Sequence, residues 1–147
     1  MSPKTVAQNR RARFDFEILE TVEAGIMLTG QEVKSCRMGH VNLAGAYVTF
    51  TNGKPILKKA KISPYAFASV SDYDPEHDRM LLLKKNELEK LRSQSETKGI
   101  TMIPLEVHAG KYIKVLLGLG KGRKNYDKRQ KIKERSIGKK LRKGEEI

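Results

Sequence analysis

The densest group of side chains that could do chemistry is an acidic cluster formed by Asp72, Asp74, Glu76, His77 and Asp78. Carboxylates this close together could hold a divalent metal ion and promote phosphodiester cleavage, as in an RNA-cleaving enzyme. The alternative is a solvated surface loop, because Pro75 follows Asp74 in a turn-like pair and residues 66–79 are polar and irregular. We favour the loop and expect no catalytic residues in it.

The other reactive side chains are isolated from one another. Cys36 is the only cysteine, so an intrachain disulfide is excluded and a Cys/His nucleophile would have to use this thiol. Its helical spacing from Val33 favours a core position, where thiols are usually inert. The three histidines, His40, His77 and His108, lie far apart in the sequence, whereas a zinc site needs about four ligands. We therefore expect no enzyme activity, no metal and no cofactor, and the cysteine usage favours a reducing, cytoplasmic location.

A glycine-rich segment, Gly118-Leu119-Gly120-Lys121-Gly122, is only loosely similar to a phosphate-binding loop. It lacks the Gly-Lys-Ser/Thr ending and does not open an apolar helix, which such loops require. We expect these glycines to release the chain from a folded domain into a tail.

Charge is concentrated at the two ends of the 147-residue chain, whose formal net charge is +13. Residues 1–13 carry a net charge of +4, residues 14–120 carry +1, and residues 121–147 carry +8. Cationic ends on a nearly neutral body predict a polyanionic partner, and nucleic acid is the leading candidate because displaced counterions favour binding at many phosphates. A merely solubilising tail is the alternative that charge alone leaves open.

A membrane is a less favoured partner. No stretch approaches 18 consecutive apolar residues, and Met1–Arg13 lacks the apolar block of a secretory signal. The tail offers few aliphatic side chains and no Trp or Phe for insertion into an interface.

Short strands, turns and two helices follow one another between residues 14 and 120. Apolar and polar residues alternate from Phe14 to Ile18, and Gly25 within the next apolar run predicts a bulge or bend. Asn52-Gly53 predicts a hairpin between residues 47–51 and 54–57, and Ala109-Gly110 predicts a second between 102–108 and 112–117.

Capping residues delimit the two expected helices. Residues 29–39 have Thr29 as a cap with Glu32 three positions later. The second helix should begin at Asn86 and end by Gly99. These elements predict a mainly β fold with flanking helices, an oligonucleotide-binding (OB) type barrel over residues 14–120. Residues 1–13 should form a flexible basic arm, and residues 121–147 a basic tail that is disordered when free and folds on RNA.

Six sequence motifs follow one another along the chain. They are Asn9-Arg10-Arg11-Ala12-Arg13, Glu23-Ala24-Gly25-Ile26, Gly30-Gln31-Glu32-Val33-Lys34-Ser35, Ile62-Ser63-Pro64-Tyr65, Leu81-Leu82-Leu83 and the tail motif from Gly120 to Glu134, which includes Tyr126-Asp127-Lys128-Arg129. In this order they resemble the small protein B family, also called SsrA-binding proteins, and the match runs from about Asn9 to Glu134.

The resemblance implies a barrel that binds the tRNA-like end of transfer-messenger RNA and takes part in ribosome rescue. It implies RNA contacts by Asn9, Glu23 and Leu82, with Arg10, Arg11 and Arg13 adding phosphate contacts. Without the family, Glu23 would be interpreted as a strand-end salt bridge and Leu82 as core packing. Phe14 stands where the family usually has His, and Met80 where it commonly has a basic residue. The resemblance therefore implies no polar RNA contact at Phe14 and no phosphate contact at Met80.

The resemblance also implies that the tail enters the empty messenger channel of a stalled ribosome. It implies that the elongation factor that delivers aminoacyl-tRNA belongs to the same complex. Tyr126 would stack near the decoding site, although from the residues alone it could equally pack on the barrel. Ile132 would anchor a helix formed on binding. Ribosomal RNA phosphates would be held by Lys121, Arg123, Lys124, Lys128, Arg129 and Lys133. Asp127 would contact the ribosome as part of the same tail motif. A general RNA-binding translation factor or ribosomal protein with an OB barrel is the alternative function.

Overall fold

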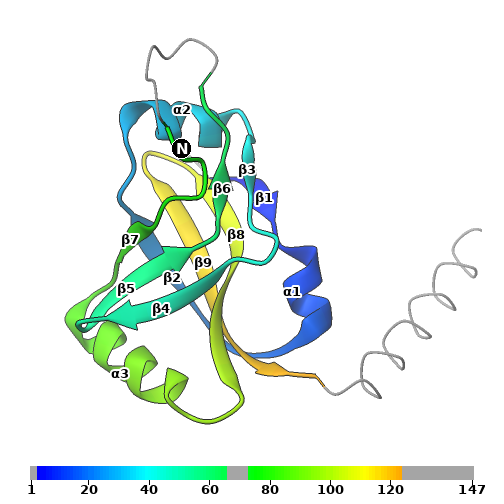
Figure 1. Ribbon diagram of the computed structural model, residues 1–147, viewed down its shortest axis with the longest axis vertical. Helices are drawn as coiled ribbons and strands as arrows, with labels where there is room; N and C mark the ends of the chain where they lie inside the picture. Colours follow the sequence, from blue (N-terminus) through cyan, green and yellow to red (C-terminus); the bar gives the residue numbers. More distant parts are fainter. Residues whose placement is uncertain (1–2, 66–72, 124–147) are drawn as a thin grey trace, which may run out of the picture.

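The computed structural model describes residues 3–65 and 73–123 (Figure 1). Within these ranges the helices are α1 (Arg10–Asp15), α2 (Gly30–Arg37) and α3 (Lys85–Ser95). The strands are β1 (Lys4–Gln8), β2 (Phe16–Ile26), β3 (Val41–Asn42), β4 (Tyr47–Thr51), β5 (Lys54–Lys58), β6 (Lys61–Ile62), β7 (Arg79–Leu82), β8 (Ile100–Ala109) and β9 (Ile113–Gly122).

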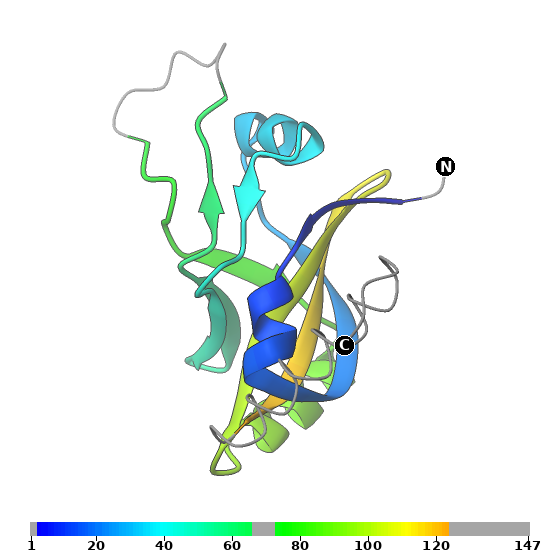
Figure 2. The ribbon, with the colours of Figure 1, turned by 90° about the vertical axis from the view of Figure 1, so that its right-hand side faces the viewer.

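A seven-stranded antiparallel sheet closes on itself to form a barrel. Its strand order is β1-β8-β4-β5-β7-β2-β9, and β9 pairs back onto β8. One edge of β8 follows β9, while the other edge is shared by β4 and β1. Helices α2 and α3 lie at opposite ends of the barrel and α1 lies on its side (Figures 1 and 2). The expected mainly β, OB-type barrel with flanking helices is confirmed.

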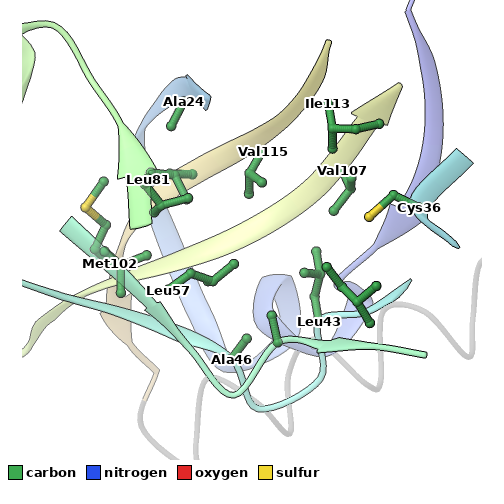
Figure 3. Close-up of a cluster of buried hydrophobic side chains, with 14 of the residues drawn as sticks. Ala24, Cys36, Leu43, Ala46, Leu57, Leu81, Met102, Val107, Ile113 and Val115 are labelled. Carbon is green, nitrogen blue, oxygen red and sulfur yellow. The ribbon is translucent and has the colours of Figure 1, made fainter. Parts of the chain in front are cut away.

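The barrel interior is filled by alternate residues of its strands (Figure 3). Leu57, Leu81, Met102, Val115 and Leu117 are each at most 2% exposed. Since successive side chains of a strand point to opposite faces, this inward set leaves the intervening residues on the outside of the barrel. Cys36 is 1% exposed in the same core, as expected.

A second, smaller core lies outside the barrel, where α1 covers β8. Ala12 of α1 packs with Ile103 and Leu105, and partly buried side chains surround them: Phe16, Ile18, Tyr47 and Leu116. A Cβ on Gly118 would lie 2.8 Å from Leu105 Cδ1, and one on Gly120 would lie 2.8 Å from Phe16 Cβ. The expectation that these glycines release the chain into a tail is therefore wrong. They lie inside β9 and make room for the second core.

The expectation of a flexible arm over residues 1–13 is also wrong for the part that the structure describes. Lys4–Gln8 forms β1 on the edge of β8, and α1 begins at Arg10. The edge of β8 offers unpaired backbone groups that a strand can satisfy, and Ala12 and Phe14 of α1 are buried. The basic residues of this segment suggested a flexible arm. Its ordered structure depends on pairing with β8, which is distant in the sequence and is not visible in a local pattern.

Several local predictions were confirmed and others need correction. The Asn52-Gly53 hairpin forms with positive φ angles of 51° and 76°, and the Thr29–Glu32 capping box is present. The bulge in β2 falls between Ile18 and Glu20 rather than at Gly25. Helix α3 begins after Lys84, two residues before the expected cap at Asn86.

Candidate nucleic-acid interface

The outer surface of β7, β2, β9 and β8 brings two of the predicted RNA-binding residues together. Gly25 pairs with Leu82 on one side and with Lys114 on the other, and Lys114 in turn pairs with His108. One step along the strands, Glu23 and Glu106 both pair with Leu116 of β9. We call this set of outward residues the barrel face; it consists of Glu23, Gly25, Leu82, Glu106, His108, Lys114 and Leu116.

Leu82 stands on the barrel face as an exposed leucine above a glycine. Its exposed fraction is 53%, which excludes plain core packing. A Cβ on Gly25 would lie 3.2 Å from Leu82 Cβ, so a larger residue at 25 would push the leucine aside. The absence of a side chain at Gly25 therefore sets the position of Leu82 and leaves an apolar surface that a ribose or base could cover.

Glu23 belongs to a chain of side chains linked by hydrogen bonds and an ion pair, which runs through His108 and Glu106 to Arg13. His108 Nδ1 lies 3.1 Å from Glu23 Oε2, and His108 Nε2 lies 3.0 Å from Glu106 Oε1. Arg13 Nη2 lies 3.5 Å from the other oxygen of Glu106. The hydrogen bond with Glu106, reinforced by the one with Glu23, raises the pKa of His108 against the opposing effect of burial. The interpretation of Glu23 as a salt-bridging residue is thus compatible with its place on the barrel face, where its side chain is 49% exposed.

Asn9 is buried and holds α1 and β1 in place. Its Nδ2 donates to the carbonyl oxygens of Leu43 and Pro104, at 3.2 and 3.0 Å, and its Oδ1 accepts from the Ala12 N–H. Its backbone N–H donates to the Leu105 carbonyl, in the gap between β1 and β4 on the edge of β8. Only 7% of Asn9 is exposed, so the structure shows it as the buried cap of α1.

The basic residues that follow Asn9 reach the surface. Arg10, Arg11 and Arg13 are exposed on α1. Arg11 Nε donates to Asp15 Oδ2 at 3.1 Å, and the Arg11 guanidinium lies 4.9 Å from the centroid of the Phe14 ring. The Phe14 ring therefore orients the Arg11 guanidinium on α1. The sequence comparison with the family pattern did not predict this role.

Of the predicted tail residues, the structure describes Lys121 and Arg123. Lys121 is an exposed residue of β9 that pairs with Glu17, and the Arg123 N–H donates to the Asp15 carbonyl at 2.9 Å. The predicted contacts of Lys124, Tyr126, Asp127, Lys128, Arg129, Ile132 and Lys133 lie outside the described residues.

The described part of the acidic cluster has structural contacts instead of a metal-binding arrangement. His77 Nε2 lies 2.8 Å from the buried Glu32, and Asp78 forms an ion pair of 2.7 Å with Lys58. Among residues 3–65 and 73–123, no group of His, Cys, Asp and Glu is placed to hold a metal ion. No described helix is long and apolar enough to cross a membrane.

Sequence reasoning missed three polar members of the barrel face: Glu106, His108 and Lys114. The signal was the alternation of polar residues with buried ones in β8 and β9, since residues at positions i and i+2 of a strand share a face. The pairing register that places His108 beside Glu23, 85 positions away, requires the folded barrel.

Comparison with known proteins gives consistent matches over most of the chain. The family model described as SmpB protein matches residues 6–146. The SsrA-binding protein of Enterococcus faecalis is 42% identical over 94% of this chain and 90% of its own. That of Thermus thermophilus is 46% identical over 90% of this chain and 93% of its own. A chain from the solved structure described as "tmRNA-SmpB: a journey to the center of the bacterial ribosome" is similar with a TM-score of 0.68 and 47% identity, covering 81% of this chain and 85% of that one.

Proposed function

The chain belongs to the SmpB family, and from this premise we propose that it binds the tRNA-like domain of transfer-messenger RNA and delivers that RNA to stalled ribosomes for trans-translation. The barrel face carries the proposal, because it joins an exposed leucine to a carboxylate that His108 holds in place. Its relatives are named for binding SsrA, and the similar solved structure for tmRNA and the ribosome.

On the barrel face, Leu82 would make apolar contact with a base or ribose, and Glu23 would accept hydrogen bonds from base edges or ribose hydroxyls. This mode of recognition depends on RNA shape and on the 2′-hydroxyl group. Arg10, Arg11 and Arg13 would add phosphate contacts that position the RNA. The predicted contact by Asn9 is retained in an indirect form, in which its buried amide fixes α1 and hence the arginines.

The basic tail would probe the ribosome while the barrel holds the RNA. We assign ribosomal RNA phosphates to Lys121, Arg123, Lys124, Lys128, Arg129 and Lys133, stacking to Tyr126 and helix anchoring to Ile132. The complex would also contain the elongation factor that delivers aminoacyl-tRNA, and it would act in the cytoplasm. In this proposal the chain binds and signals without catalysing a reaction.

A competition experiment with matched leucine variants tests the proposal. Leu82 and Leu19 are each 53% exposed, but Leu19 lies at the bulge of β2, away from the barrel face. Leu82→Ala should weaken binding to the tRNA-like domain by about tenfold, which corresponds to about 1.4 kcal/mol. Leu19→Ala should bind as the unchanged protein does.

The same experiment separates the alternative function. A general RNA-binding translation factor or ribosomal protein would bind the tRNA-like domain and bulk cellular RNA with equal affinity at fixed salt. Equal affinities, together with equal effects of the two leucine variants, would exclude the specific function.

A further inference from the structure

Three segments distant in sequence meet at the end of the barrel formed by the β8–β9 turn (Figures 1 and 2). The Arg37 guanidinium, at the end of α2, donates to the Gly110 carbonyl at 2.9 Å and to the Lys111 carbonyl at 3.3 Å. Lys4, at the start of β1, pairs with Ala109 on the other side of the turn. These contacts fix the three segments relative to one another.

The charged side chains of these three segments all have one sign. Residues 3–8, 33–41 and 109–114, which the structure describes, contain no aspartate or glutamate. Their cations come from all three segments, and four of them are exposed: Lys4, Lys34, Arg37 and Lys111. Since the folded body as a whole is nearly neutral, this local excess is a property of the fold and favours a polyanion.

An exposed aromatic ring lies among these cations. Tyr112 is 65% exposed at the tip of the turn, and the ammonium group of Lys111 lies 5.7 Å from its ring centroid. The ring face that the ammonium leaves open could stack on a nucleic-acid base, an interaction worth about 1–3 kcal/mol. We call Lys4, Arg37, Lys111 and Tyr112 the tip patch.

We propose that the tip patch is a second RNA-binding site, which takes an unpaired nucleotide with its base on Tyr112 and its flanking phosphates on Lys4 and Lys111. Arg37 contributes charge and holds the turn in its binding shape. Lys114 lies two residues from Tyr112 and belongs to the barrel face, so the two surfaces are continuous. We therefore assign the tip patch to the same RNA, a step that rests on the proposed function.

Stacking is tested with two substitutions of the exposed Tyr112 in the full-length chain. The probes are the tRNA-like domain of transfer-messenger RNA and a short single-stranded oligonucleotide. Tyr112→Ala should weaken binding to both by about 5- to 150-fold, from the stacking energy. Tyr112→Phe should bind both normally, because it keeps the ring and loses only the hydroxyl.

The phosphate contacts are tested by salt dependence. Substituting Lys4 and Lys111 by Gln should lower the slope of log affinity against log salt concentration by about 1–2, since each lost phosphate contact contributes about 0.7–0.9. The matched control substitutes Lys85 and Lys98 by Gln; both are exposed at the other end of the barrel, on and just after α3, and the slope should not change.

Failure of this inference is distinct from failure of the proposed function. If Tyr112→Ala and the Lys4/Lys111 variant bind both RNAs like the unchanged protein, the tip patch is not an RNA site, as would happen if it took an acidic protein instead. If the unchanged protein shows no preference for the tRNA-like domain while Tyr112→Ala still loses affinity for the oligonucleotide, the tip patch stands and the proposed function falls.

Discussion

His108 is held so that both of its ring nitrogens face carboxylates. A neutral imidazole has one N–H and one lone pair, so one nitrogen would oppose Glu23 or Glu106 without a proton. The imidazolium satisfies both carboxylates and explains why the pKa of His108 is raised. Arg13 faces Glu106 from α1, and Lys114 neighbours His108 from β9. With His108 protonated, the barrel face carries no excess of negative charge that would repel RNA.

The stabilisation from His108 should disappear as the pH rises. The group titrates near 6.5 when unfolded and at a higher pH in the folded chain. Its contribution is therefore fully present below about pH 6.5 and is lost as the pH increases through the folded pKa. Urea unfolding should show that His108→Gln lowers the free energy of unfolding by about 1 kcal/mol at pH 6 and by less at pH 9.

The exposed His40 provides the control for this measurement. His40→Gln should keep the pH profile of the unchanged protein. If His108→Gln lowers stability equally at pH 6 and pH 9, the imidazolium bridge is absent.

At the scale of elements, a buried ion pair fastens residues 73–79 to α2. Glu32 Oε2 accepts from Arg79 Nε at 2.9 Å and from the hydroxyl of Tyr73 at 3.1 Å, and Arg79 and Glu32 are each 2% exposed. Burial would raise the pKa of Glu32, but hydrogen bonds from the Thr29 N–H, Arg79 and His77 outweigh it and lower that pKa to about 2. One carboxylate thus caps a helix and anchors a loop.

Removal of this carboxylate should be costly. Glu32→Gln leaves Arg79 buried without its counter-charge, and we expect a loss of about 3–5 kcal/mol at neutral pH, measured by urea unfolding. Because the folded pKa is depressed, the stabilisation is present above about pH 4.5 and is lost as the pH falls through about 2. Between pH 5 and pH 2.5, the unchanged protein should therefore lose more stability than the variant does.

An exposed pair from the same loop serves as the control. Asp78→Asn breaks the exposed Lys58 ion pair and should lower the free energy of unfolding far less than Glu32→Gln does. Similar losses from Asp78→Asn and Glu32→Gln would mean that the Glu32–Arg79 pair contributes no more than a surface one.

The contacts of Glu32 show which features can be predicted from local sequence and which cannot. The Thr29–Glu32 spacing predicted the capping box, because both partners lie in one helical turn. The Arg79 contact joins residues 47 positions apart and requires the closed barrel. For the same reason Leu82 was identified only by family resemblance, since its exposure depends on the cross-strand position of Gly25.

At the scale of the whole molecule, the separation of a nearly neutral body from a basic end follows from composition, but the boundary between them does not. Sequence placed the end of the barrel at residue 120, whereas β9 continues to Gly122. Phe16 pairs with Gly122, and the Arg123 N–H donates to the Asp15 carbonyl. Lys121 and Arg123, the first two cations of the predicted tail, therefore also belong to the β2–β9 side of the barrel.

Two truncations test this boundary and the division of labour together. A chain ending after Arg123 retains all of β9, so it should bind the tRNA-like domain within about tenfold of the full chain, roughly 1.4 kcal/mol. The same chain should lose tagging on stalled ribosomes in a reconstituted translation assay. A chain ending after Gly118 loses the pairs that Leu119, Gly120 and Lys121 make with β2 and β8, so its midpoint of thermal unfolding should fall as well.

The two readouts distinguish a separable tail from a shared RNA grip. A chain that ends after Arg123 and keeps its thermal midpoint but loses more than about tenfold in RNA affinity would show that residues beyond 123 hold the tRNA-like domain as well. A chain that ends there and still supports tagging would show that the ribosome is engaged by the barrel itself. Only retained RNA binding combined with lost tagging is compatible with a body that selects the RNA and an end that probes the ribosome.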